Sequence, residues 1–219
     1  MITVAMITKD EAKAITKVVT DIRKVMPAAE ILIVDSSRDQ TPQIAEGLGV
    51  RVIRQFPAQG YGKAMDLALR SAAGAIVITL DCDDTYPVDQ IPVMADMVLN
   101  KGYDLVDASR LKHKPKAMPL INYLANWGFA LIASLFFSQR LTDLHSGMRA
   151  YRKSMIDAIV FDLRGAALPV ELLLKPLKKG FKLRTIFIEY RKRIGASKME
   201  PLKGAWWTLL RIVKTRFGT

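Results

Sequence analysis

The stretch Ala75-Ile76-Val77-Ile78-Thr79-Leu80-Asp81-Cys82-Asp83-Asp84-Thr85-Tyr86-Pro87 decides the fold of this chain. Its first half, residues 75–80, is a β-branched apolar run without polar alternation, which is typical of a strand buried on both faces of a parallel sheet. The run ends in three carboxylates, and Pro87 then opens a helical pattern. We therefore expect these carboxylates at the carboxyl end of a central strand, where open α/β sheets bind their ligands.

Asp81 and Asp83 are the candidate metal ligands. An Asp-x-Asp at a strand end suits a hard divalent cation, Mg²⁺ or Mn²⁺, with nucleotide phosphates completing the coordination shell. An isolated Asp-x-Asp is more often a solvated acidic turn. The buried strand before it and the pattern of the surrounding chain favour the metal site here.

The rest of the chain alternates predicted strands with predicted helices. Hydrophobic periodicity places strands at residues 2–8, 30–34, 50–53, 75–80, 103–107 and 181–190, and helices at 10–26, 41–48, 64–73, 88–99, 117–138, 169–179 and 200–217. This alternation predicts an α/β fold with a mainly parallel sheet and right-handed crossovers. We expect one α/β domain at residues 1–199, followed by a C-terminal helix at 200–219.

Composition limits the classes of partner and compartment. The chain has 219 residues, of which 50% are hydrophobic, so it can bury a core. Its formal net charge of +12 indicates an anionic partner: nucleic acid, an acidic membrane surface or a phosphorylated substrate. Cys82 is the single cysteine, which excludes an internal disulfide framework, and the sequence has no zinc-type Cys/His cluster. Charged residues soon after the first apolar run do not fit a signal peptide.

Polar residues follow other predicted strands. Asp35 ends the second strand, where a carboxylate bonds a ribose or base in nucleotide-binding folds, or else caps the next turn. The loop at Gly60–Lys63 suits an approach of backbone N–H groups and the Lys63 ammonium to phosphate. Residues 141–152 crowd polar side chains into one segment, which indicates an anion-binding loop or, alternatively, a turn followed by a strand. Two basic loops, residues 104–116 and 191–198, complete the set, and the alternative for the first is a solvated surface patch.

Two segments have the character of membrane-surface helices. Residues 117–138 carry no charge, and a polar or small stripe recurs at Asn122, Asn126, Ala130, Ser134 and Ser138. This pattern favours a helix lying on a membrane with its stripe toward the protein, or else a fully buried core helix. The tail places Leu202, Trp206, Leu209, Val213 and Phe217 on one helical face, with cations mostly elsewhere. Such a helix suits an anionic membrane interface, or packs on the core.

Six short motifs occur in a fixed order. They are Val34–Thr41, Gly60–Ala64, Asp81–Asp83, Ser109–Arg110, Asp143–Arg149 and Arg193–Lys198, the last reading Arg-Ile-Gly-Ala-Ser-Lys. Together they resemble the motifs of family-2 glycosyltransferases of the GT-A fold, most closely the polyprenyl-phosphate branch of the dolichol-phosphate mannose synthase type. The segment Ile7–Glu11 departs from the Pro-x-x-Asn-Glu of that family.

The resemblance implies roles for individual residues. It implies that the nucleotide sugar is bound by Thr8, Glu11, Asp35, Gly62, Lys63 and Asp81, and the metal by Asp81 and Asp83. It implies that the acceptor phosphate is bound by Arg110, Ser146, Arg149, Arg193 and Ser197. Where the family carries an Arg and a Ser toward that phosphate, this sequence has Met118 and Asn122, so we expect Lys114 or Lys116 to substitute. It implies catalytic roles for Asp83, Asp143, Arg110 and Arg149. We expect the Arg193 loop to lie away from the metal site.

The function that the resemblance implies is an inverting hexose transfer from a GDP-mannose- or UDP-glucose-type donor to a polyprenyl phosphate. The expected enzyme depends on Mg²⁺ or Mn²⁺ and attaches peripherally to the cytoplasmic face of a membrane, without a nucleic-acid partner. The alternatives are a family-2 transferase with a soluble acceptor, a nucleotidyltransferase, a basic nucleic-acid-binding protein and a catalytically silent membrane adaptor. The clustering of basic residues in loops, rather than in a stripe with stacking aromatics, disfavours nucleic acid.

Overall fold

The computed structural model describes residues 1–165, 167–195 and 201–218. The strands of the described part are β1 Ile2–Thr8, β2 Glu30–Asp35, β3 Arg51–Arg54, β4 Ile76–Thr79, β5 Leu105–Ser109, β6 Arg149–Arg152 and β7 Leu183–Phe187. The helices are α1 Ile15–Val25, α2 Thr41–Gly47, α3 Tyr61–Ser71, η1 Val88–Gln90, α4 Ile91–Leu99, α5 Leu120–Phe137, α6 Lys153–Asp157, α7 Leu168–Lys178 and α8 Pro201–Phe217.

All of these strands form one sheet in the order β3-β2-β1-β4-β6-β5-β7, which confirms the predicted α/β class. The pairs β1–β2, β1–β4, β2–β3 and β5–β7 are parallel. β6 is antiparallel to both of its neighbours, β4 and β5. The sequence predicted no strand order and left residues 149–152 open between loop and strand. The antiparallel strand brings the residues before β6 to the same sheet edge as the ends of β4 and β5.

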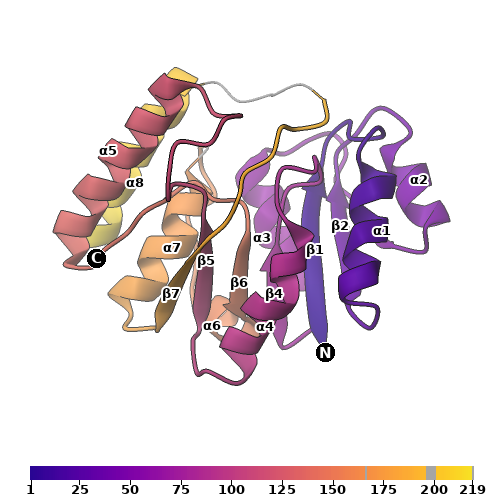
Figure 1. Ribbon diagram of the computed structural model, residues 1–219, viewed down its shortest axis with the longest axis horizontal. Coiled ribbons are helices and arrows are strands. Elements are labelled where there is room, and N and C mark those ends of the chain that lie inside the picture. The colour runs from indigo at the N-terminus through magenta and orange to yellow at the C-terminus, as the bar shows by residue number, and fades with distance from the viewer. Residues whose placement is uncertain (166, 196–200, 219) are drawn as a thin grey trace.

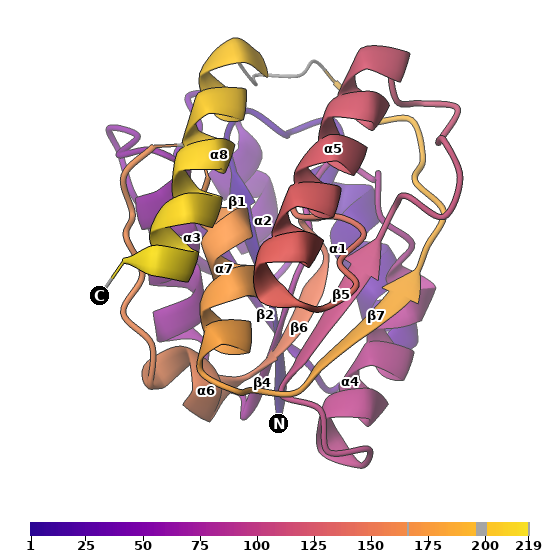
Figure 2. The ribbon, with the colours of Figure 1, turned by 90° about the vertical axis from the view of Figure 1, so that its left-hand side faces the viewer.

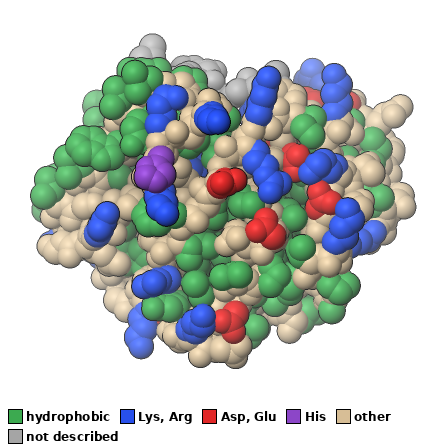
Figure 3. Space-filling model, in the orientation of Figure 1, with side chains coloured by type: hydrophobic (Ala, Val, Ile, Leu, Met, Phe, Trp, Pro, Cys, Tyr) green, Lys and Arg blue, Asp and Glu red, His purple; other side chains and the backbone are tan. Residues whose placement is uncertain are grey.

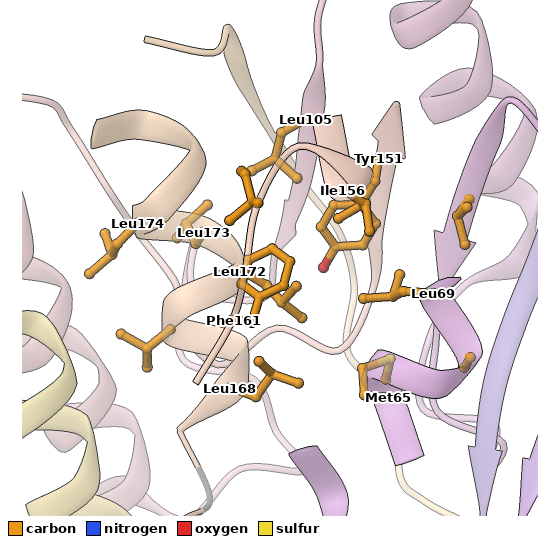
Figure 4. Close-up of a cluster of buried hydrophobic side chains, with 14 of the residues drawn as sticks. Met65, Leu69, Leu105, Tyr151, Ile156, Phe161, Leu168, Leu172, Leu173 and Leu174 are labelled. Atoms are coloured by element: carbon orange, nitrogen blue, oxygen red, sulfur yellow. The ribbon is translucent and has the colours of Figure 1, made fainter. Parts of the chain in front are cut away.

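The two faces of the sheet have separate hydrophobic cores, because successive strand residues point to opposite sides. Val4 and Met6 pack with α1, α2 and α4, whereas Ala5 packs with α3, α6 and α7. Figure 1 shows the sheet between these two layers of helices. In Figure 4, Met65 and Leu69 of α3 face the buried cluster formed by β6, α6 and α7. Burial of each side chain of this size stabilises the fold by roughly 1.5–3 kcal/mol. The two cores therefore hold in place the sheet edge that carries the site.

α5 and α8 lie side by side at one end of the molecule (Figures 1 and 2). Their Phe136 and Phe217 rings meet with centroids 5.5 Å apart. α5 is long and apolar enough to cross a membrane by length and composition, but only 11% of it is buried, so it is not a core helix. The predicted stripe is confirmed at its centre: Ala130 is buried, and the Ser134 hydroxyl accepts a hydrogen bond from the Leu141 N–H at 2.9 Å. Asn122 and Ser138, at the two ends, are exposed.

α8 is both packed and exposed, which combines the two alternatives predicted for it. Its inner side buries Thr208, Arg211, Ile212 and Thr215. Arg211 pairs with Asp162 at 2.9 Å and with Glu171 of α7 at 3.4 Å. The outer side presents Trp206, Leu209, Val213 and Phe217. The helix is therefore anchored to the α/β body while it shows an apolar face to the surroundings.

Candidate functional site

Asp81 and Asp83 lie just beyond the carboxyl end of β4, as the sequence predicts. Asp83 is buried, and its Oδ1 accepts hydrogen bonds from the Thr85 N–H at 3.1 Å and the Thr85 hydroxyl at 2.6 Å. This turn uses only Oδ1, and Oδ2 of Asp83 faces the Arg193 guanidinium. The local structure thus fixes one oxygen and makes the second available as a ligand.

Gly147 covers the Asp81 carboxylate. A Cβ added at Gly147 would lie 2.9–3.1 Å from the carboxylate atoms of Asp81, so any side chain there would displace that carboxylate. The glycine is held in place because its N–H donates to the Tyr86 hydroxyl at 2.7 Å, and its carbonyl accepts from the Thr79 hydroxyl at 2.9 Å. The glycine therefore lets the loop before β6 approach Asp81 closely.

The electrostatics of Asp81 fit a cation site. Burial raises the pKa of Asp81 to about 7, with the neighbouring Asp83 carboxylate as the second cause. Arg110 and Arg193 offset this effect in part. A group whose ionised form is disfavoured by burial and a like charge gains from a divalent cation. The described residues contain no cluster of three or more metal-ligating side chains, so oxygens from outside the protein side chains would be needed to complete the shell of a bound cation.

Arg193 lies on the acidic motif. Its Nη2 is 3.1 Å from Oδ2 of Asp83 and 3.6 Å from a carboxylate oxygen of Glu11. The backbone supports this position, because the Ile194 N–H donates to the Asp83 carbonyl at 2.9 Å and the Arg191 N–H to the Thr85 carbonyl at 3.0 Å. The expectation that this loop lies away from the metal site is therefore wrong. Ser197 of the same motif lies outside the described residues.

Arg110 and Asp143 form a clamp beside the motif. The guanidinium binds both carboxylate oxygens, with Nε at 2.7 Å and Nη2 at 3.0 Å, and its carbon lies 5.2 Å from the centre of the Tyr190 ring. Burial alone would raise the pKa of Asp143, but Arg110 lowers it below the usual range. Asp143 therefore stays ionised and orients Arg110. The catalytic role that the resemblance implies for it stays a prediction.

Arg149 and Ser146 do not face the acceptor site. Arg149 is 1% exposed; its Nε donates to Asp107 at 2.6 Å, and it also donates to the carbonyl of Pro169. Ser146 donates its hydroxyl to the Ala108 carbonyl at 2.6 Å and is 2% exposed. The phosphate-binding and catalytic roles expected for these two residues are corrected: they bind β6 and its loop to β5.

Thr8 and Asp35 are engaged with the protein itself. Asp35 is fully buried and accepts hydrogen bonds from the Thr8 hydroxyl at 2.7 Å and the Ser37 hydroxyl at 2.6 Å, and it pairs with Arg54. A cavity of about 260 Å³ opens beside them, lined by Lys9, Asp10, Ser36, Arg38, Phe56, Pro57 and Ala58. The direct contact expected between Asp35 and a ribose or base is thus replaced by support for the wall of this cavity.

Gly62 and Lys63 open helix α3. Gly62 packs against the Leu163 carbonyl, where a Cβ would lie at 2.4 Å, so its lack of a side chain serves helix packing and not an approach to phosphate. Lys63 is exposed in the first turn, behind the N-cap Gly60 with φ of +97°. The Asp81 carboxylate is one cause, after burial, that raises the pKa of Tyr61. The start of α3 therefore lies near the acidic motif.

Sequence reasoning missed the aromatic frame and the loop contacts of the site. Tyr86 and Tyr190 meet edge to face at 5.7 Å and support Gly147 and Arg110. Tyr86 comes shortly after the acidic motif, and Tyr190 ends the last predicted strand. Their places in the sequence are the only features that could have suggested a role in the site. His145 lies in the polar segment at residues 141–152, but the sequence gives no signal of its contact with Thr208 of α8.

Comparisons with known proteins agree on one family. The model of the family described as Glycosyl transferase family 2 matches residues 3–160. A dolichyl-phosphate hexose transferase of Haloferax volcanii is 39% identical over 202 residues, which cover 92% of this chain and 87% of that protein. An undecaprenyl-phosphate mannosyltransferase of Micrococcus luteus is 25% identical and covers 88% of this chain and 84% of that protein.

The fold also matches solved structures. Glucosyl-3-phosphoglycerate synthase from Mycobacterium tuberculosis, in complex with Mn²⁺, uridine diphosphate and phosphoglyceric acid, superposes with a TM-score of 0.80. The match covers 99% of this chain and 78% of that chain at 17% identity. Mannosyl-3-phosphoglycerate synthase from Rubrobacter xylanophilus gives a TM-score of 0.76 at 17% identity, over 99% of this chain and 73% of that chain. At this identity the likeness shows the GT-A fold alone.

Proposed function

This chain belongs to glycosyl transferase family 2, and we propose that it transfers a hexose from a nucleotide sugar to a polyprenyl phosphate at a membrane surface. One observation carries the proposal: the acidic motif, the Arg110–Asp143 clamp and the exposed faces of α5 and α8 belong to one connected part of the molecule. Thr142, next to Asp143, and Leu111, next to Arg110, line a groove of about 770 Å³ along α5. A substrate with an anionic head and an apolar tail matches this arrangement. The 39%-identical relative carries a name of the same class.

Asp81 and Asp83 are the residues that would hold Mg²⁺ or Mn²⁺. When bound, such a cation neutralises the diphosphate of the donor as it leaves. The acceptor phosphate is already an anion near neutral pH, so it attacks the anomeric carbon without a strong general base. Inversion follows from a single displacement, and the bond to the nucleoside diphosphate breaks as the new phosphate–sugar bond forms. Catalysis then rests on positioning and charge stabilisation.

The cationic groups divide between the two substrates. Arg110 is fixed by Asp143 and presents a bidentate donor, which suits phosphate better than a lysine. Lys63, at the start of α3, is available for donor phosphates. The cavity lined by Arg38 and Phe56 takes the base of the donor. The basic residues near the acidic motif thus allow two anionic substrates to meet there.

Arg193 and a bound cation compete for Asp83. Replacing Arg193 with alanine removes the ion pair to Asp83 and Glu11, and should lower the Mn²⁺ dissociation constant by about twofold to fivefold, the value of a partly exposed pair. The same variant should transfer sugar more slowly, since the acceptor phosphate loses a cation. Isothermal titration with Mn²⁺ and steady-state kinetics with each substrate varied separately measure the two effects.

The matched control for this experiment is Arg191→Ala. Arg191 is exposed in the same loop and touches the motif through its backbone N–H, which alanine retains. Its Mn²⁺ affinity should equal that of the wild type. A Mn²⁺ affinity of Arg193→Ala that is unchanged or weaker would contradict the competition.

The outer faces of α5 and α8 form the proposed membrane-binding surface. Figure 3 shows hydrophobic side chains gathered at the end of the molecule where these helices lie, with Lys and Arg beside them. Trp206 and Phe217 are each 67% exposed, and Ile121 and Leu135 of α5 are more exposed still. Apolar side chains flanked by cations suit an anionic bilayer surface. We propose that the protein binds peripherally through this surface, on the cytoplasmic face of the membrane.

Changing Trp206 and Phe217 together to serine should lower the partition coefficient onto anionic vesicles at least about tenfold, because both lose apolar burial. Salt at ~0.5 M should weaken wild-type binding without abolishing it, since charge is screened and apolar burial remains. Vesicle sedimentation measures both effects. The control Leu99→Ser changes an exposed leucine of α4, on the opposite face of the sheet, and should have no effect. Equal binding by the double variant and the control would refute the surface.

The direct test of the function is a transfer assay. UDP-, GDP- and CDP-sugars are first screened with Mn²⁺ or Mg²⁺ by thermal shift, because a true ligand stabilises by ~2.7 kcal/mol at 100 times its dissociation constant. The best donor is then offered with polyprenyl phosphate or with a soluble phosphorylated acid. Transfer to the lipid supports the proposal, and transfer to the soluble acceptor alone overturns it.

A further inference from the structure

His145 connects the active-site loop to both surface helices. Its backbone N–H donates to Oδ1 of Asp143 at 3.0 Å, so the residue is tied to the clamp that holds Arg110. Its imidazole Nε2 lies 2.8 Å from the Thr208 hydroxyl oxygen of α8. The same ring packs at 5.9 Å against Phe129 of α5. His145 therefore contacts the two helices of the proposed membrane surface through its side chain and Asp143, which orients Arg110, through its backbone N–H.

The hydrogen bonds around His145 determine which nitrogen of its ring carries the proton. The Thr208 hydroxyl donates its single proton to the Gly204 carbonyl at 2.9 Å, so its oxygen must accept from Nε2–H of His145. Nδ1 is buried and has no partner among the described residues, which places no proton there, since a buried donor without an acceptor is costly. Burial also lowers the pKa of His145 to about 4, so the ring is neutral at physiological pH.

The loop that His145 anchors controls two parts of the site. Asp143 holds both nitrogens of the Arg110 fork, and Gly147 lies against the Asp81 carboxylate. A movement of α8 relative to the sheet would shift this loop through the His145–Thr208 bond. The Arg211 contacts hold α8 to α7 and to residue 162 and do not involve this loop.

We propose that His145 is a positioning residue, which couples the seating of α8 on a membrane to the orientation of Arg110 through the Nε2–H hydrogen bond to Thr208. This inference rests on the proposed function and adds a form of regulation to it. Membrane binding at the outer face of α8 fixes the position of this helix. Through the hydrogen bond between Thr208 and His145, it also restricts the motion of the loop that carries Asp143. The enzyme should therefore turn over faster on a membrane even when its acceptor does not need one.

A short, water-soluble prenyl phosphate separates this effect from delivery of the acceptor. With that acceptor, anionic vesicles should raise the kcat of the wild type by about fivefold, the factor that corresponds to one hydrogen bond. Thr208→Val removes the acceptor hydroxyl and should lose most of this increase, whereas Thr208→Ser keeps it. Thr208 is 1% exposed on the inner side of α8, so vesicle binding itself should be equal in all three proteins. An equal increase in the valine and serine variants would overturn the coupling.

Nuclear magnetic resonance tests the hydrogen bond between His145 and Thr208 without an enzyme assay. The chain has two histidines, and ¹⁵N-histidine labelling resolves them because His113 is exposed. In the wild type, His145 should show the Nε2–H tautomer and no protonation down to a pH of about 5. Thr208→Val should lose this single tautomer. A mixture of tautomers for His145 in the wild type would refute the bond.

The two proposals fail in different ways. A wild type that transfers no sugar would defeat the proposed function and with it the regulation, whatever the histidine spectra show. A wild type that transfers sugar with the same vesicle response as Thr208→Val would defeat the coupling alone.

Discussion

Asparagine in place of Asp83 is expected to lower the turnover number for sugar transfer by roughly two to three orders of magnitude, since it removes a charged oxygen from the cation site. The fold should persist. The amide oxygen of asparagine can still accept the two hydrogen bonds from Thr85, and only the oxygen facing Arg193 is lost. Thermal shift should show no Mn²⁺-dependent stabilisation by the nucleotide sugar, together with a melting temperature near that of the wild type.

The neighbouring acid provides the matched control. Asp84 pairs with Lys17 at 2.7 Å and has a left-handed φ of +64°, which asparagine tolerates well. Asp84→Asn should therefore leave turnover within about twofold, because an exposed pair contributes little. If Asp83→Asn transfers sugar as fast as Asp84→Asn, the Asp-x-Asp does not hold the cation.

Methionine in place of Arg149 is expected to lower the free energy of unfolding by about 3–5 kcal/mol. The guanidinium and the Asp107 carboxylate are both almost fully buried, so removing one partner leaves a charge in the interior. The Pro169 and Leu144 carbonyls also lose a donor. Urea denaturation followed by circular dichroism measures the loss.

A double variant separates structure from catalysis at this position. Asp107→Leu combined with Arg149→Met removes both charges and should recover much of the lost stability, because an apolar pair replaces the ion pair. Its Michaelis constant for the acceptor should stay within a few-fold of the wild type. If the double variant folds but has a strongly raised Michaelis constant for the acceptor, Arg149 contributes to acceptor binding and the structural role alone is wrong.

The position of Asp81 and Asp83 at the end of β4 could be predicted from sequence because it depends on local pattern. A buried β-branched run followed by Asp81 and Asp83 predicts a buried strand with the two carboxylates at its end. The structure confirms this, because β4 is buried in the sheet and ends just before them. The amphipathic face of α8 was equally predictable, since periodicity alone defines it. Both features need no knowledge of distant partners.

The roles of the arginines could not be predicted in the same way. Arg110, Arg149 and Arg193 all stand in plausible anion-binding motifs, yet the structure gives them Asp143, Asp107 and Asp83 as partners. Each partner is more than 30 residues away in sequence. The pairing depends on strand order, above all on the place of β6, and no local signal encodes that order.

The central place of β6 has a consequence for the order in which the chain can fold. The strands β1 to β4 can pair as soon as residue 79 has been synthesised, whereas both neighbours of β5 come later in the chain. Until residues 149–152 arrive, β4 and β5 each present an open edge to other chains, which is the surface on which aggregation starts. A nascent chain that stalls between α4 and β6 is therefore the species for which a chaperone matters most.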